Sequence, residues 1–267
     1  MVGTSRHTLT FPGSMGAMLA GRLDLPQGPP AAYALFAHCF TCTKDVLAAS
    51  RVSAALAARG FAVLRFDFTG LGESGGDFAD TGFTSNVADL VAAAAFLREH
   101  YAAPSLLVGH SFGGAAVLAA VGKVPEARAV ATIAAPADPE HIRHLIAAAI
   151  PEIEAKGEAV VRIAGRDLKF RRQFLDDIRT ADLTRKIADM RQALLVLHSP
   201  LDDTVGVENA AMIFGAAKHP KSFISLDGAD HLLSRAADAE YAAHVLSAWA
   251  ARYIGAPQAT VAAAADS

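Results

Sequence analysis

Two serines, Ser74 and Ser111, lie in the pattern G-x-S-x-G, in which a serine hydroxyl can act as a nucleophile. The pattern alone is weak evidence, so its setting has to decide between them. Residues 109–113 directly follow the apolar run SLLV and open the helical stretch FGGAAVLAAV. A sharp turn between a strand and a helix is the setting that exposes a nucleophilic serine. The sequence therefore favours Ser111.

The sharp turn explains why glycine occupies the positions two residues before and after Ser111. At so sharp a turn, side chains at Gly109 and Gly113 would clash with the backbone around them. The helix that follows directs its positive N-terminal end towards a developing oxyanion. Ser74, in contrast, lies several residues past its strand and no helix follows it. We expect Ser74 to be a turn or capping residue in a surface loop.

A serine hydroxyl needs a base, and the base needs a carboxylate to orient it. The run ALLVL is followed by HSPLDDTV, and the run SFISL by DGADHLL. Asp202 in the first loop and His231 in the second give the chain order serine, acid, histidine that accompanies this kind of turn. Asp203 is the competing acid, because a one-residue shift of the loop would exchange the two. Asp230 adjoins His231 and is expected to point elsewhere.

Four other histidines need an interpretation. His38, His110 and His198 lie in or beside strand ends, where an orienting or packing role is expected. His38 and His110 are also candidates for contact with the substrate. His219 precedes a proline in a linker and is expected at the surface.

Acyl transfer through a serine also needs two N–H groups that stabilise the oxyanion. One is expected from Phe112, the residue after the nucleophile. The other should come from the loop after the run at 33–37, which reads HCFTCTKD. We predict that the Phe40 N–H is this second donor.

The same loop contains both cysteines of the chain, Cys39 and Cys42, in a C-x-x-C pattern. Two cysteines cannot form a disulfide framework, and zinc would need a second pair of ligands. They are expected either to pack as two small buried side chains or to be a redox pair. In the redox case, oxidation is expected to distort the oxyanion loop, because the cysteines flank Phe40.

Short apolar runs alternate with amphipathic stretches along the chain, which indicates βαβ units and a buried parallel sheet. The strands and the catalytic loops that follow them would then meet at one edge of the sheet. The expected strands are 8–11, 18–25, 33–37, 61–66, 105–108, 129–133, 193–197 and 222–226, and the expected helices are 47–59, 85–101, 112–124, 207–217 and 238–253.

The alternation stops between residues 138 and 190, where we expect a helix at 139–150, a hairpin within 159–170 and one or two further helices. This predicts a core of residues 1–137 and 191–255 with a cap inserted at 138–190, and a disordered tail at 256–267. An insertion of this kind covers a site or forms a second structural layer. Its basic residues, Arg171 and Arg172 foremost, are either contacts for a substrate carboxylate or part of a solvated surface. The others are Arg162, Arg166 and Lys169.

Composition excludes several classes of protein. Of the 267 residues, 52% are hydrophobic, which gives ample material for a core and rules out a disordered chain. A net charge of -3 argues against nucleic acid as the main partner. No apolar run approaches the roughly 20 residues that span a bilayer, and no secretory signal is visible. A cytoplasmic protein is expected, with no metal or organic cofactor.

These motifs resemble those of the α/β-hydrolase superfamily over about residues 5–254. The resemblance rests on the elbow GHSFGG, the loop FDFTGLGES, the acid loop HSPLDDTV and the histidine loop GADHLL. It implies an α/β-hydrolase fold, with a mostly parallel central sheet of about eight strands, helices on both faces and a small cap. HCFTCTKD resembles the H-G-F-T-G loop of feruloyl/cinnamoyl-esterase-like members, with Cys39 and Cys42 in place of glycines. By that resemblance, Phe40 and Phe112 are the oxyanion donors.

A second resemblance is to the hydrolase module of proteins that carry a C-terminal OsmC-like domain. It rests on phrases such as AHCFTC, RFDFTGLGES and HSPLDDTVGVENAA, and it implies an OsmC-like domain or partner. The expected activity is hydrolysis of carboxylic esters of short to medium acyl or aryl acids through an acyl-enzyme on Ser111. The alternatives are acyl or peroxyacid transfer with the same triad, and a non-catalytic or redox partner module.

Overall fold

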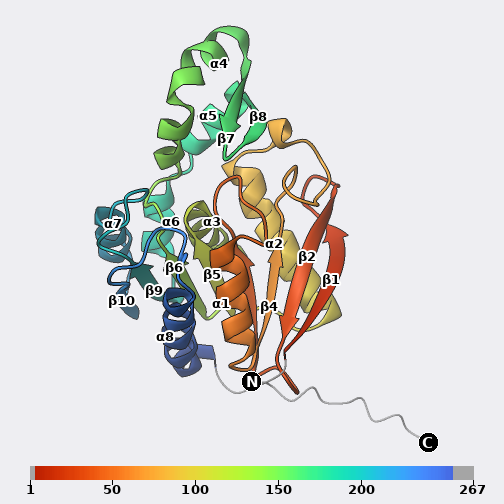
Figure 1. The fold of residues 1–267 in the computed structure, drawn as a ribbon, viewed down its shortest axis with the longest axis vertical. Helices are drawn as coiled ribbons and strands as arrows, with labels where there is room; N and C mark the ends of the chain where they lie inside the picture. Colours follow the sequence, from red (N-terminus) through yellow and green to blue (C-terminus); the bar gives the residue numbers. More distant parts are fainter. Residues whose placement is uncertain (1–3, 255–267) are drawn as a thin grey trace, which may run out of the picture.

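The computed structural model describes residues 4–254, and its centre is a sheet of eight strands (Figure 1). The strand order is β1-β2-β4-β3-β5-β6-β9-β10. β2 pairs antiparallel with β1 and with β4, and every other pair in this sheet is parallel. The prediction of a mostly parallel sheet is confirmed. The strands are β1 (Ser5–Pro12), β2 (Met18–Leu25), β3 (Ala32–Ala37), β4 (Phe61–Phe66), β5 (Leu106–His110), β6 (Ala129–Ile133), β9 (Ala193–His198) and β10 (Lys221–Ser225).

The inner strands are mostly apolar because both faces of the sheet are covered. The buried Arg65 of β4 is an exception, and its Nε–H donates to Asp24 Oδ2 over 2.9 Å. In β4, Leu64 and Phe66 pack on one side of the sheet, whereas Phe61 and Val63 pack on the other. The helices α1 (Leu47–Ala57) and α8 (Ala236–Ile254) cover the second side and contact each other. The first side is covered by α2 (Phe83–His100), α3 (Phe112–Ala120), α6 (Leu183–Asp189) and α7 (Glu208–Ala216).

Residues between β6 and α6 form the insertion, most of which stands beyond one end of the sheet (Figure 1). Where one helix was predicted at 139–150, a 3-10 helix, η3 (Pro139–Ala149), is followed by α4 (Ile150–Lys156). Pro151 has no N–H to donate, so an α-helix cannot continue through it with full bonding. The hairpin consists of β7 (Glu158–Ile163) and β8 (Arg166–Arg171), and α5 (Arg172–Arg179) follows it.

The chain changes direction across the sheet between β3 and β5. It runs from β3 to β4 on one side and then returns to β5 on the other side of β3. At such a switch point the loops after the two strands diverge and leave a crevice, in which open α/β sheets bind their ligands. The loop after β3 and the turn after β5 are the two that contain Phe40 and Ser111.

The structure bears differently on the predicted tail and on the prediction that no segment spans a membrane. The tail predicted at 256–267 lies outside the described residues. Among the helices within residues 4–254, none combines the length and the apolar character that a membrane crossing requires.

Candidate active site

Ser111, His231 and Asp202 form a continuous hydrogen-bonded chain. The Ser111 hydroxyl donates to His231 Nε2 over 3.0 Å, and His231 Nδ1–H donates to Asp202 Oδ2 over 2.8 Å. The three residues follow β5, β10 and β9, so their side chains meet at the carboxyl edge of the sheet. All three are buried, at 8% exposure each. A neutral His231 in this tautomer can accept the serine proton, as a general base must.

The turn at Ser111 is as sharp as the motif predicts. Its φ is +55°, a left-handed value that few non-glycine residues adopt. A Cβ at Gly109 would lie 2.3 Å from the Gly113 oxygen, and a Cβ at Gly113 would lie 2.4 Å from the oxygens of Ala37 and His38. Both positions therefore require glycine because the backbone approaches too closely for any side chain.

Asp202, rather than Asp203, faces His231. Asp202 Oδ1 accepts the N–H groups of Thr204 and Val205, each at 2.9 Å, which fixes the carboxylate. Burial pushes the pKa of Asp202 upwards, but the bonds from His231 and from these two N–H groups outweigh burial and lower it. Asp202 is thus ionised beside His231. Asp203 is exposed.

Asp230 and His219 also lie as predicted, away from the reacting groups. Asp230 is exposed and accepts the Ser234 N–H at 2.7 Å. His219 is exposed in the segment before β10.

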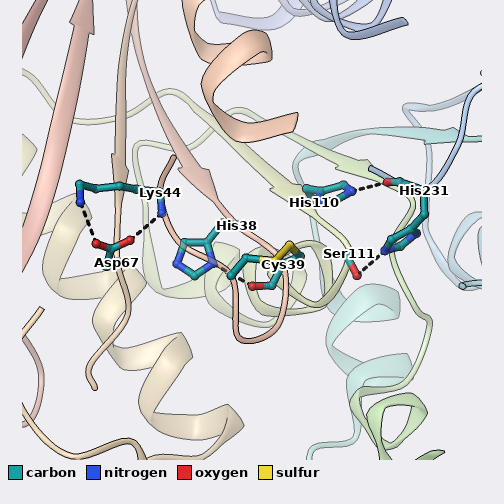
Figure 2. The surroundings of a disulfide bond; sticks show 8 residues. His38, Cys39, Lys44, Asp67, His110, Ser111 and His231 are labelled. Carbon is teal, nitrogen blue, oxygen red and sulfur yellow. Dashed lines mark hydrogen bonds and ion pairs between the residues drawn. A yellow bond between two sulfur atoms is a disulfide. The ribbon is translucent and has the colours of Figure 1, made fainter. Parts of the chain in front are cut away.

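His110 holds the backbone of His231, the candidate base. It is fully buried, and its Nε2–H donates to the His231 carbonyl oxygen over 2.7 Å (Figure 2). Burial and the neighbouring His231 lower the pKa of His110 to about 3. The ring is therefore neutral at physiological pH, and its proton lies on Nε2 because a carbonyl oxygen only accepts. A neutral neighbour also avoids electrostatic repulsion when His231 becomes protonated.

His198 supports the acid loop in the same way. It is fully buried at the end of β9, and its Nε2–H donates to the Val205 carbonyl oxygen over 2.8 Å. Burial lowers its pKa, so this ring is neutral too. Its Nε2 lies 3.6 Å from Asp202 Oδ2. The loop that carries Asp202 is thus fastened at Asp202 itself and at Val205.

Another buried histidine, His38, belongs to the loop after β3. Its Nδ1–H donates to the Cys39 carbonyl oxygen over 2.8 Å, and burial lowers its pKa. The next residue but one is Phe40, whose N–H has no acceptor among residues 4–254. The Phe112 N–H, at the first position of α3, is free of an intrahelical partner as well. These are the two donors predicted for an oxyanion.

The cysteines are not two separate thiols. Cys39 and Cys42 are joined by a disulfide, which corrects the expectation that they only pack. The bond closes a four-residue turn in which the Cys42 N–H also donates to the Cys39 carbonyl oxygen over 3.2 Å. Thr41, the third residue of this turn, has a φ of +56°. Glycine or asparagine normally fills that position of a type II turn, and a β-branched residue there is strained.

Beyond the turn, a buried ion pair joins this loop to the loop that follows β4. Lys44 is 1% exposed, and its Nζ donates to Asp67 Oδ2 at 2.8 Å (Figure 2). The same Nζ donates to Glu73 Oε2 at 2.5 Å. The Lys44 N–H donates to Asp67 Oδ1 at 2.6 Å. Burial lowers the pKa of Lys44, but the bonds to the two carboxylates outweigh it and raise the pKa. The ammonium thus remains charged.

Ser74, the serine of the other motif, lies in a loop that follows β4. Its Oγ accepts the Ala20 N–H at 2.9 Å and donates to the Asp67 carbonyl oxygen at 2.5 Å. Both bonds are to backbone, and no histidine within residues 4–254 is hydrogen-bonded to this hydroxyl. Ser74 joins its loop to β2 and closes the loop on Asp67, as a turn residue would.

An aromatic cluster connects the insertion to the candidate oxyanion loop. The Phe40 ring lies 5.1 Å from Phe112 and 5.8 Å from Phe174, measured between ring centroids. Phe170 lies 5.2 Å from Phe78 and from Phe174. Because Phe170 and Phe174 come from β8 and α5, the insertion packs directly on the residue that is predicted to donate to the oxyanion.

A cavity of about 150 Å³ opens at Ser111. Ser111, His231, Cys39 and Cys42 form the part of the lining next to the candidate nucleophile. The rest is mostly apolar, with two histidines from η3. This remaining lining consists of Phe40, Phe112, Pro136, His141, Ile142, His144, Leu145, Thr204, Val205 and Leu232.

Four residues that were predicted to contact substrate do not line this cavity. His38 and His110 bind backbone oxygens instead, as described above. Arg171 pairs with Asp80 and Glu158, and Arg172 donates to the Glu154 carbonyl oxygen. Each of the four donates at least one hydrogen bond elsewhere in the protein, although His38 Nε2 and His110 Nδ1 are buried without a partner. Substrate contact by these residues therefore stays a prediction that the lining of this cavity does not support.

Conversely, the sequence analysis missed His141, His144, Ile142 and Leu145, which belong to η3. His141 donates to the Thr204 carbonyl oxygen over 3.0 Å, and His144 donates to the His141 carbonyl oxygen over 2.5 Å. One feature of the sequence could have indicated that η3 lines the cavity: this segment directly follows β6, at the same edge of the sheet as Ser111. Within residues 4–254, no group of three or more acidic, histidine or cysteine side chains is arranged to hold a metal ion.

Comparison with known proteins agrees with this architecture. Residues 34–245 match the alpha/beta hydrolase family. The esterase domain of a Rhodothermus marinus protein is 50% identical, with a TM-score of 0.77 over 94% of this chain and 100% of that one. Est1E of Butyrivibrio proteoclasticus, solved with ferulic acid, is 19% identical, with a TM-score of 0.75 over 92% and 99%. No curated protein gives a significant match.

The fold and the serine-centred site together define a hydrolase of the α/β class. The chain belongs to the alpha/beta hydrolase family, and the solved structures similar to it include esterases.

Proposed function

We propose that this protein is a serine carboxylic-ester hydrolase. The observation that carries the proposal is the Ser111–His231–Asp202 chain, with bonds of 3.0 and 2.8 Å, at the base of a cavity. The 50% identity to a protein described as an esterase domain supports the same chemistry.

Each group in the site has a definite task. His231 Nε2 accepts the proton of Ser111 as Oγ attacks the ester carbonyl carbon, and the carbonyl oxygen becomes an oxyanion. The N–H groups of Phe40 and Phe112 donate to that oxyanion. His231 then returns the proton to the leaving oxygen, and the C–O bond breaks to release the alcohol.

The second half of the reaction repeats the first with water. His231 takes a proton from a water molecule, whose oxygen attacks the acyl carbon on Ser111. The acid leaves and Ser111 regains its proton. Asp202 stays ionised throughout and stabilises the imidazolium of His231.

The size and lining of the cavity suggest the substrate class. A dry cavity of roughly 150 Å³ with apolar walls is large enough to hold a benzene ring. This one has a similar volume and walls that include Phe40, Phe112 and Ile142. We therefore propose esters of aryl acids and of short to medium acyl acids as substrates. We also propose that the protein is located in the cytoplasm.

The test is to measure initial rates on p-nitrophenyl esters with acyl chains from two to twelve carbons. The wild type should prefer the short chains, and Ser111→Ala should lower kcat by at least about 10⁴-fold. Ser74→Ala is the matched control. It should lose about 1–2 kcal/mol of stability with the two backbone bonds but keep its kcat.

Two outcomes would refute the proposal. A folded wild type that is inactive across the whole ester panel would exclude this substrate class. Equal activity of Ser111→Ala and wild type would exclude the assigned nucleophile.

A further inference from the structure

The disulfide lies on a segment of the candidate site that has to place a backbone N–H without support from a helix or strand. Phe40 lies between Cys39 and Cys42, and both cysteines line the same cavity as Ser111. Figure 2 shows Cys39 on this segment, between the Lys44–Asp67 pair and Ser111. Any change at the sulfur atoms must therefore act on the loop that presents the Phe40 N–H.

The two cysteines of the disulfide differ in their exposure to solvent. Cys39 is 5% exposed, whereas Cys42 is half-buried at the cavity wall. Thiol–disulfide exchange begins when a thiolate attacks one sulfur of the bond, and the accessible sulfur is the one attacked. A small thiol that enters the ester cavity meets Cys42 first, and Cys39 is then the leaving group.

We propose that the Cys39–Cys42 disulfide is a thiol-exchange site that opens into the ester cavity, and that its reduction lowers ester turnover. This proposal rests on the hydrolysis at Ser111 proposed above. The ligand class is a small thiol or dithiol.

The exchange balances with the thiol as the reductant. A thiolate attacks Cys42 Sγ, the S–S bond breaks, and Cys39 leaves as a thiolate that takes up a proton. A second thiolate attacks the outer sulfur of the mixed disulfide and releases the Cys42 thiolate, which is protonated in turn. Two thiols are oxidised to one small disulfide, and the protein gains two thiols.

Reduction should move the loop for two reasons. Once the covalent bond is broken, the two sulfur atoms must separate to the distance of non-bonded atoms within a packed wall. Thr41, with its φ of +56°, is then no longer held in a ring and can relax to an ordinary β-branched conformation. Both changes shift the Phe40 N–H, which lies between the same two cysteines.

The direction is opposite to the one expected from the sequence, where oxidation was predicted to distort the loop. In the disulfide form, the Phe40 N–H is free and the Ser111–His231–Asp202 chain is intact. The oxidised protein is therefore the competent form. In a cytoplasm, where most protein thiols are kept reduced, such a disulfide would be transient. Its redox state would follow the ratio of small thiols to small disulfides in the cell.

The experiment compares the oxidised and reduced wild type after the reductant has been removed anaerobically. Iodoacetamide labelling and intact mass should give no labelled cysteine in the oxidised protein and two in the reduced one. We expect kcat on p-nitrophenyl acetate to fall roughly tenfold or more on reduction. This loss is smaller than the 10²–10³-fold loss for complete removal of an oxyanion donor. Reoxidation should restore kcat.

The matched control is the double variant Cys39→Ser/Cys42→Ser. These are the only two cysteines of the chain, so its kcat should not respond to reductant and should resemble that of the reduced wild type. Equal kcat in oxidised and reduced wild type would overturn the proposal. So would two labelled cysteines in protein that was never reduced.

A second readout separates this proposal from the proposed function. A fluorophosphonate labels an activated serine without an ester substrate, and its rate depends on the same oxyanion donors. If neither form hydrolyses esters but labelling of Ser111 slows on reduction, the ester assignment fails and the redox control stands. If Ser111 is labelled at the same rate in both forms, the redox control fails, whatever happens with esters.

Discussion

At the residue scale, the site depends on side chains that do not react. His110 and His198 are neutral and each donates one bond to the carbonyl oxygen of a loop that carries a catalytic candidate. A residue of this kind acts through the geometry of another residue, so its substitution should affect kcat more than KM.

For His110 this gives a specific prediction. His110→Ala removes the donor to the His231 carbonyl oxygen, and we expect kcat on p-nitrophenyl acetate to fall about tenfold, or about 1.4 kcal/mol. His110→Gln should recover most of kcat, because its amide can donate from nearly the same place. If the kcat of His110→Gln is as low as that of His110→Ala, loss of the hydrogen bond to the His231 carbonyl oxygen does not explain the lower kcat.

The same residue predicts a pH effect on stability. The pKa of His110 in the folded protein is about 3, whereas a free histidine titrates near 6.5. Between these values the unfolded chain binds a proton that the folded protein does not, so stability is full above about pH 6.5 and is lost as the pH falls. In urea unfolding between about pH 4 and pH 6, the His110→Gln slope should be shallower than that of wild type by up to about 1.4 kcal/mol per pH unit. Equal slopes would contradict the low pKa.

The sequence predicted Ser111, Asp202 and His231 because each lies in a motif or at a strand end. It also predicted an orienting or packing role for His110, but not the partner of that residue, because the partner is a backbone oxygen 121 residues away. A pattern of residue types carries no information about such a bond.

At the element scale, the loops after β3 and β4 are fastened to each other by one buried charge pair. The Lys44 ammonium and backbone both bind Asp67, and the Glu73 N–H donates to the same carboxylate at 3.0 Å. The order of the loop that carries Phe40 therefore depends on residues that do not line the cavity at Ser111.

Lys44→Met tests this dependence. It leaves the buried Asp67 carboxylate without its counter-charge, and we expect a loss of about 3–5 kcal/mol in urea unfolding. The double variant Lys44→Met/Asp67→Asn removes the uncompensated charge and should be more stable than the single one. A double variant that is less stable than Lys44→Met would rule out this electrostatic explanation.

The elements themselves were largely predictable. Strands such as β4 and β9 are apolar apart from Arg65 in β4 and the final His198 in β9, and that pattern identifies a strand buried on both faces. The exception is η3, where the apolar spacing predicted a regular helix up to Ile150. Pro151 changes the bonding there, and the Ile150 N–H donates to Ala147 in the 3-10 manner.

At the scale of the whole molecule, the insertion and the sheet share one apolar cluster rather than forming two separate bodies. Phe170 and Phe174 are 1% and 2% exposed, and their rings pack on Phe78 and Phe40. No local pattern relates residue 40 to residue 174, so the sequence could predict the insertion but not how it packs on the site.

This contact predicts that the insertion controls both stability and the range of substrates. Phe174→Ala removes a buried ring and should cost about 3–5 kcal/mol in urea unfolding. It also leaves space beside Phe40, so kcat/KM should shift towards longer acyl chains in the p-nitrophenyl series. Val160→Ala is the matched control, because Val160 lies in the same insertion but is 62% exposed. It should change stability by less than about 0.5 kcal/mol and leave the chain-length profile unchanged. If Phe174→Ala is destabilised but keeps the wild-type profile, the insertion supports the fold without shaping the cavity.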